Sequence, residues 1–222
     1  YFFPFTEGFD YAAAGDLDYL KSKVDGSPCD IMLELIQGEG GVLPQDPDFV
    51  KAVRALCDEK DLLLIIDEVQ TGIGRTGSLF CFQQYGIQPD VVTMAKGLGG
   101  GLPVGAVMAA KTCCDVLGPG THATTFGGSP TVCAAANAVL SIVNDDKFLA
   151  EVREKGAYLK DKILALGSPS IHGVRGKGLM LGIIVDEGQH SVFANKLIEH
   201  GVLAITAGKN AVRLLPPLTI TY

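Results

Sequence analysis

The stretch Leu62-Leu-Leu-Ile-Ile-Asp67-Glu68 indicates the fold class of this 222-residue chain. Five consecutive apolar residues followed by two acids are typical of a buried strand in a mostly parallel sheet. Such a strand places Asp67 at its carboxyl end, the edge of an open α/β sheet where ligands bind. The surrounding sequence should then supply further strands and the helices that cover them.

Short apolar segments alternate with helical segments on both sides of this stretch, which predicts a mostly parallel sheet flanked by helices, an α/β fold. The helix at 130–143 has Ser129 at the N-cap position and Pro130 in its first turn. The expected strands are 31–35, 62–66, 91–94 and 104–109, and the expected helices are 48–60 and 130–143.

The pattern changes after residue 144, where a charged amphipathic helix begins. The run of elements that follows predicts a smaller α+β domain at the C-terminus. Its expected elements are helix 147–166, strand 174–185, helix 191–200, and strands 202–206 and 211–215. We therefore expect two units, one over 1–144 and a smaller one over 145–222.

The composition excludes several classes of function. A net charge of -7 without a Lys/Arg cluster argues against nucleic-acid binding and against docking on an anionic membrane. No apolar run approaches the roughly 20 residues of a membrane span. Six cysteines without CxxC spacing indicate reduced thiols of a cytoplasmic protein, and four scattered histidines predict no metal site. Small molecules and protein subunits are the expected partners.

Asp67 has two interpretations on the residues alone. A carboxylate at a strand end can pair with the protonated ring nitrogen of a pyridine cofactor, which keeps that ring electron-withdrawing. It can equally cap the helix that follows.

Lys96 directly follows the expected strand 91–94 and one alanine, and four glycines come within the next five residues. A lysine beside a buried strand is costly unless its amine is paired, neutralised or covalently used, and neighbouring glycines let a bulky ligand approach the backbone. Schiff-base lysines are activated in such settings. A lone Lys-Gly is more often a surface loop, and the glycines match neither a dinucleotide loop nor a phosphate loop.

The segment Gly120–Pro130 combines hydroxyl side chains with glycine amides just ahead of a predicted helix. Free N–H groups and the helix dipole at such a position favour a phosphate. A capped turn without a ligand is the commoner interpretation.

Taken together, these three segments resemble the class III, fold type I aminotransferases that use pyridoxal 5'-phosphate, and most closely their acetylornithine branch. The resemblance runs from about Ile31 to Leu218 and rests on Ile66–Gly72, on Lys96 and on the Thr-Phe-Gly-Gly-x-Pro turn ending at Pro130. It implies part of an aspartate-aminotransferase-like large domain followed by the small C-terminal domain.

The resemblance assigns the cofactor site residue by residue. Lys96 would form the Schiff base and move the proton during catalysis, and Asp67 would hold the pyridine nitrogen protonated. Val69 would pack beneath the ring, while Gln70 would contact the ring hydroxyl or the lysine region. Thr125 would bind the cofactor phosphate of the neighbouring subunit, which implies a homodimer with its active sites at the interface.

The resemblance also assigns the substrate site. Arg213 would grip the α-carboxylate of glutamate and 2-oxoglutarate, a task that suits a planar guanidinium. Glu39 would pair with this arginine, and Thr124 would contact substrate. Without the resemblance, Arg213 would be interpreted as a surface ion pair.

The implied reaction transfers the distal amine of N-acetylornithine to 2-oxoglutarate in arginine biosynthesis, in the cytoplasm. The Gly120–Pro130 and Arg175–Gly182 segments favour this branch over ornithine, succinylornithine or 4-aminobutyrate transaminases. An aminomutase and a truncated non-catalytic homologue remain as alternatives. Leu35 and Ser129 stand where the family usually has Pro and Asn. The family's N-terminal half and last helix have no counterpart, so we expect a fragment that is inactive or nearly so by itself.

Overall fold

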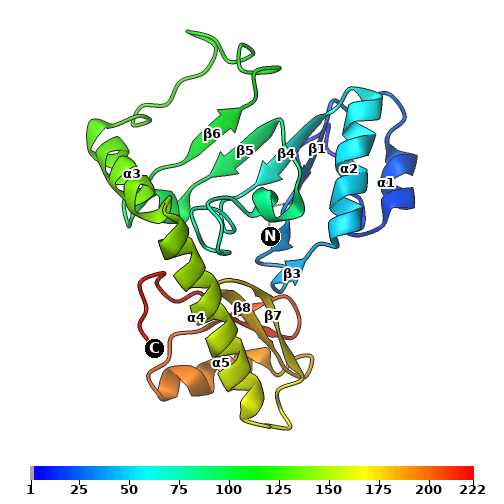
Figure 1. The fold of residues 1–222 in the computed structure, drawn as a ribbon. Helices are drawn as coiled ribbons and strands as arrows, with labels where there is room; N and C mark the ends of the chain where they lie inside the picture. Colours follow the sequence, from blue (N-terminus) through cyan, green and yellow to red (C-terminus); the bar gives the residue numbers. More distant parts are fainter. Residues whose placement is uncertain (1–2) are drawn as a thin grey trace.

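The computed structural model describes residues 3–222 and contains two main sheets, joined by the helices α3 (Pro130–Val143) and α4 (Asp146–Ala165) (Figure 1). Among these residues no helix is long and apolar enough to cross a membrane. The predicted helices and strands are present within a few residues of their expected bounds, apart from the region 174–185. The helix α1 (Leu17–Lys23) and the two-stranded hairpin of β2 (Ile36–Gln37) and β3 (Leu43–Pro44) are additional.

The first sheet has the order β1-β4-β5-β6. Its strands are β1 (Asp30–Leu33), β4 (Leu63–Asp67), β5 (Val91–Met94) and β6 (Ala106–Ala109). β1, β4 and β5 are parallel and β6 is antiparallel, which confirms the predicted mostly parallel sheet. Because the first three strands share a direction, their carboxyl ends lie along one edge, where the residues after each strand come together.

The helix α2 (Pro47–Lys60) covers this sheet on the side of β1 and β4 (Figure 1). Asp46 caps it, since its side chain accepts hydrogen bonds from the N–H groups of Asp48 and Phe49, and Pro47 occupies the first turn. The helix buries one apolar face against the sheet, formed by Val50, Val53, Leu56 and Cys57.

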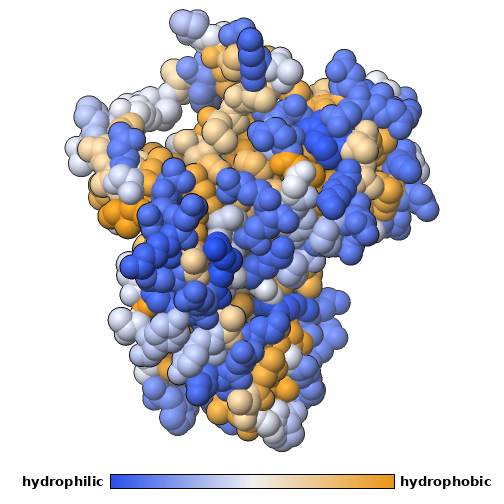
Figure 2. Space-filling view, viewed as in Figure 1, coloured by the Kyte–Doolittle hydropathy of each residue, from blue (hydrophilic) through white to orange (hydrophobic). Residues whose placement is uncertain are grey.

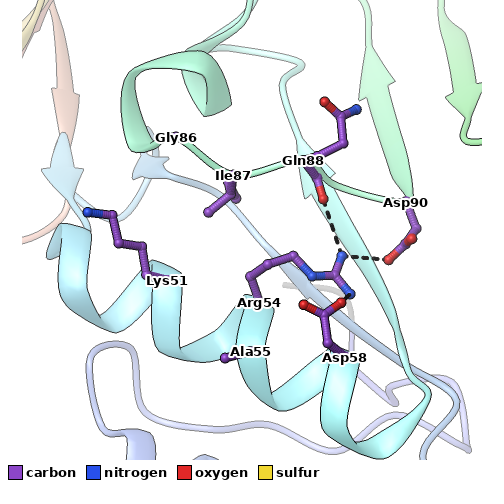
Figure 3. Close-up of a pocket in the computed structure, with 8 residues that line it drawn as sticks. All are labelled: Lys51, Arg54, Ala55, Asp58, Gly86, Ile87, Gln88 and Asp90. Carbon is purple, nitrogen blue, oxygen red and sulfur yellow. Dashed lines mark hydrogen bonds and ion pairs between the residues drawn. The ribbon is translucent and has the colours of Figure 1, made fainter.

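An ion-pair network also fixes α2 to the start of β5 (Figure 3). Arg54 contacts Asp90 at 2.7 Å and Asp58 at 2.8 Å, and it donates to the carbonyl of Gln88 at 3.3 Å. Burial alone would raise the pKa of Asp90, but the hydrogen bond from Leu64 N–H and the Arg54 pair outweigh it and lower that pKa. Both carboxylates already bind Arg54, so we interpret the surface hollow beside it as a structural contact between α2 and β5 and not as a ligand site.

The second sheet is antiparallel throughout, with the order β7-β8-β10-β9. Its strands are β7 (Gly173–Lys177), β8 (Met180–Ile184), β9 (Ile205–Ala207) and β10 (Ala211–Leu214). The helices α4 and α5 (His190–Glu199) pack against it. A separate apolar cluster, which includes Ile183, Ala194 and Val212, forms its core.

The prediction of one strand over 174–185 is wrong, because β7 and β8 form a hairpin there. Gly178 at the turn has φ 53°, a left-handed conformation that glycine adopts without strain. A Cβ at this position would also lie 2.7 Å from the carbonyl oxygen of Arg75. Gly173, Gly176 and Gly182 lie within the two strands, so Gly178 does not stand out in the sequence as a turn.

The boundary between the two predicted domains stays a prediction. The larger apolar cluster is centred on the first sheet, yet it includes Leu149 from α4 and Met180 from β8. Part of the surface of the first sheet is apolar, and Figure 2 shows hydrophobic atoms over β6 and α3. Val107 and Met108 on β6 are 63% and 43% exposed, so this edge of the sheet is uncovered in the single chain.

Candidate active site

The carboxyl edge of the first sheet brings two of the predicted site residues together. Asp67 ends β4 and pairs in register with Thr93 of the adjacent parallel strand β5. Lys96 lies three residues beyond Thr93, at the first position of the short helix η2 (Lys96–Gly99). Its φ of 45° is uncommon for a residue with a side chain, and such conformations cluster at functional sites.

A cavity of about 540 Å³ opens beside Lys96, between the two sheets. Five of the predicted site residues line it: Glu39, Val69, Gln70, Lys96 and Arg213. They come from the β2–β3 hairpin, the turn after β4, the start of η2 and the strand β10. The fold therefore assembles most of the predicted site from segments that are far apart in sequence. Asp67 lies at the sheet edge without lining this cavity itself.

A three-residue cluster forms one side of the cavity. Arg213 Nη1 lies 2.8 Å from Glu39 Oε1 and donates to Gln70 Oε1 at 2.9 Å, while Gln70 Nε2 donates to Glu39 Oε1 at 3.2 Å. The hydrogen bond from Arg213 lowers the pKa of Glu39. Arg213 is 5% exposed, whereas the Glu39 side chain is 73% exposed. The structure thus contains the Glu39–Arg213 ion pair, and Gln70 contacts both of its members, while their roles in substrate binding stay predictions.

Asp67 and Lys96 each have a polar atom that could bind a ligand. Asp67 Oδ1 accepts the N–H of Val69 at 2.8 Å. Within residues 3–222, neither Asp67 Oδ2 nor the Lys96 amine has a hydrogen bond or ion pair. A free carboxylate oxygen and a free amine at one sheet edge fit a cofactor that carries a protonated ring nitrogen and an aldehyde.

Thr124 and Thr125 are not brought to this cavity. Both lie on an exposed segment between β6 and α3, and neither lines the cavity of the single chain. Ser129 occupies the N-cap position of α3, but its side chain makes no capping hydrogen bond. The roles of the two threonines, and the anion site ahead of α3, stay predictions.

Three charged residues of this region had no predicted role. Glu34 follows β1 at the same edge and accepts the N–H of Gly38 at 3.0 Å, and burial raises its pKa. Arg75 lines the cavity and donates to the carbonyls of Leu179 and Pro216 at 3.1 and 2.6 Å, and burial lowers its pKa.

The third residue, Glu68, is fully buried. It accepts from Thr71 Oγ1 at 2.5 Å and from Phe82 N–H at 2.9 Å, and burial raises its pKa. Of these residues, only Glu68 had a signal in the sequence, because it comes just after the predicted strand 62–66, whereas Glu34 lies inside the predicted strand 31–35. The end of a strand predicts where a ligand site lies, but it does not predict which of the acids there face the ligand.

The chain and its fold match a known enzyme family. The family model described as Aminotransferase class-III matches residues 5–222, and the chain belongs to this family. An acetylornithine aminotransferase from Caldanaerobacter subterraneus subsp. tengcongensis is 49% identical over 99% of this chain and 56% of its own length. The chain thus spans about half the length of the curated relatives that it matches.

Solved structures give the same result. N-acetylornithine aminotransferase from Stenotrophomonas maltophilia K279a superposes with a TM-score of 0.90 at 36% identity, over 98% of this chain and 58% of that one. An ornithine aminotransferase from Toxoplasma gondii, which shows partial occupancy of PLP at its active site, has a TM-score of 0.91 at 36% identity. The match covers 98% of this chain and 53% of the Toxoplasma gondii chain.

Proposed function

We propose that this chain carries the lysine and the substrate-carboxylate site of a pyridoxal-phosphate aminotransferase. The reaction transfers the distal amine of N-acetylornithine to 2-oxoglutarate, in arginine biosynthesis in the cytoplasm. The observation that supports it best is the cavity in which Lys96 and the Glu39–Arg213 pair lie together. The acetylornithine aminotransferases among the relatives support the choice of substrate.

The cofactor would be held by residues of the first sheet. Asp67 would keep its ring nitrogen protonated through the carboxylate oxygen that has no partner within residues 3–222, and Val69 would pack beneath the ring. When bound, pyridoxal phosphate supplies an electron sink for the bonds around the transferred amine. Lys96 Nζ would hold the cofactor aldehyde and, once the substrate amine displaces it, the freed Nζ would take the proton from the carbon that bears this amine.

The substrate would be oriented by Arg213. Its guanidinium is almost fully buried, which strengthens a bidentate contact with a carboxylate. Glu39 holds this cation in the present structure and, being largely exposed, can release it to the α-carboxylate of 2-oxoglutarate or glutamate. Thr124 would contact substrate. The proposed division at residues 144–145 then puts the cofactor contacts in 1–144 and Arg213 in 145–222.

A substrate panel tests this function. With added pyridoxal phosphate, the protein at its natural full length should show its highest kcat/KM for N-acetylornithine with 2-oxoglutarate. The comparison substrates are ornithine, N-succinylornithine and 4-aminobutyrate. Residues 1–222 alone should show little or no turnover. Turnover without an oxo acid would indicate an aminomutase, and no turnover at full length would favour a non-catalytic homologue.

A mixing experiment tests the proposed homodimer. If Thr125 of one subunit binds the cofactor phosphate of the other, co-expressing Lys96→Ala and Thr125→Ala chains should restore activity that each variant lacks. In a mixed dimer, one site has the intact Lys96 of the Thr125→Ala chain and the intact Thr125 of the Lys96→Ala chain. The two variants should be co-expressed with different tags and assayed after tandem purification. Activity no higher than that of the Thr125→Ala dimer would contradict a shared site.

A further inference from the structure

Gln70 contacts both members of the Glu39–Arg213 pair with one side-chain amide. Its oxygen accepts from Arg213 at 2.9 Å, and its nitrogen donates to Glu39 at 3.2 Å. An amide can satisfy a cation and a carboxylate at once because its two ends have opposite hydrogen-bonding character. It is also neutral, so it holds the guanidinium without neutralising the charge that attracts a carboxylate.

The backbone next to Glu39 packs closely against the Gln70 amide. A Cβ at Gly38 would lie 2.4 Å from Gln70 Oε1, so a side chain at that position would displace the amide. The same loop is fixed by hydrogen bonds to its backbone. Gly208 N–H donates to the carbonyl of Glu39 at 2.8 Å, and Arg175 Nε donates to the carbonyl of Gly41 at 2.8 Å. The backbone of this loop is therefore fixed, whereas the Glu39 side chain is 73% exposed and is held by its contacts with Arg213 and Gln70.

We propose that Gln70 is a positioning residue for Arg213, in addition to its predicted cofactor contact. When the Glu39 side chain releases Arg213 to a substrate carboxylate, the Gln70 amide keeps the guanidinium aimed into the cavity. Arg213 Nε is buried without a hydrogen-bond partner within residues 3–222, so Gln70 is the neutral side chain that restrains this cation. This inference rests on the proposed function, in which Arg213 binds the substrate carboxylate.

Binding of glutarate tests this role without turnover, because glutarate has two carboxylates and no group that can react. Its Kd should be measured by titration calorimetry on the cofactor-loaded protein at its natural full length. Gln70→Met keeps the length and bulk of the side chain but removes the amide. It should weaken glutarate binding roughly 10-fold, as expected for a lost hydrogen bond to a charged group. Gln70→Glu should weaken it further, because a second carboxylate then competes for Arg213.

The controls separate this inference from the proposed function. Glu39→Gln should tighten glutarate binding, since it removes the competing carboxylate, and Arg213→Gln should abolish it. Butylamine has no carboxylate, so its reaction with the cofactor reports the predicted cofactor contact of Gln70 alone, and Gln70→Met should weaken glutarate binding by a larger factor than it slows this reaction. A Gln70→Met Kd within twofold of the wild type, with Arg213→Gln unable to bind, would overturn the inference alone. If the wild type does not bind glutarate, or Arg213→Gln binds it normally, the carboxylate site itself is wrong.

Discussion

Lys96→Ala should lower kcat for transamination by more than about 10³-fold, in the upper part of the 10²–10⁴ range for general acid–base catalysis. Under the proposed function, the substitution removes both the group that would bind the cofactor aldehyde and the group that would move the proton. The structure explains why no neighbour should replace it. The Lys96 amine has no partner within residues 3–222, and the nearby cation Arg213 is held by Glu39 and Gln70. Steady-state kinetics and the absorbance of the bound cofactor should both be recorded.

Small amines provide the decisive control for Lys96. Methylamine added to Lys96→Ala should restore part of the proton-transfer rate, because it can occupy the space left by the side chain. A folding defect would not respond to an added amine. Lys96→Arg keeps a positive charge but not the nucleophilic amine, so it should be as inactive as alanine. A kcat for Lys96→Ala within 10-fold of the wild type would contradict the assignment.

The sequence allows the catalytic edge to be predicted because strand ends are encoded locally. The run ending at Asp67 and the strand before Lys96 are each defined by a few adjacent apolar residues, and parallel strands must end at one edge. Their placement together then follows from the fold class. The identity of the ligand does not follow, and it comes from the resemblance of the motifs to a known family.

The contacts of Gln70 could not be predicted in this way. They depend on Gly38 and Arg213, which lie 32 residues before and 143 residues after it in the chain. The absence of a side chain at Gly38 makes room for the Gln70 amide only because the β2–β3 hairpin packs beside the turn after β4. Arg213 likewise reaches the cavity only because β10 belongs to a second sheet. The β7–β8 turn also escaped prediction, because Gly178 is one of several glycines in this segment and its neighbours Gly173, Gly176 and Gly182 lie within strands.

The buried Glu68 leads to a prediction about stability. Glu68→Ala should lower the free energy of unfolding by about 2–4 kcal/mol, because the Thr71 hydroxyl and the Phe82 N–H would lose their buried acceptor. Urea unfolding followed by circular dichroism measures this change. Glu68→Gln keeps the shape and one acceptor oxygen, so it should be less destabilising than alanine. An alanine variant as stable as the wild type would contradict a structural role for this carboxyl.

The pH dependence distinguishes the charge of Glu68 from its hydrogen bonds. Burial raises its pKa above the value of about 4.3 expected in the unfolded chain, so its contribution to stability is complete below that pH and is lost as the pH rises through the folded pKa. Glutamine does not titrate, so the stability advantage of the wild type over Glu68→Gln should shrink from pH 4 to pH 8. If this advantage grew instead, the folded state would hold the carboxylate by favourable contacts that outweigh its burial. Glu68 lies between Asp67 and Val69, in the turn after β4. The measurement therefore reports the charge state of the buried carboxyl that anchors this turn.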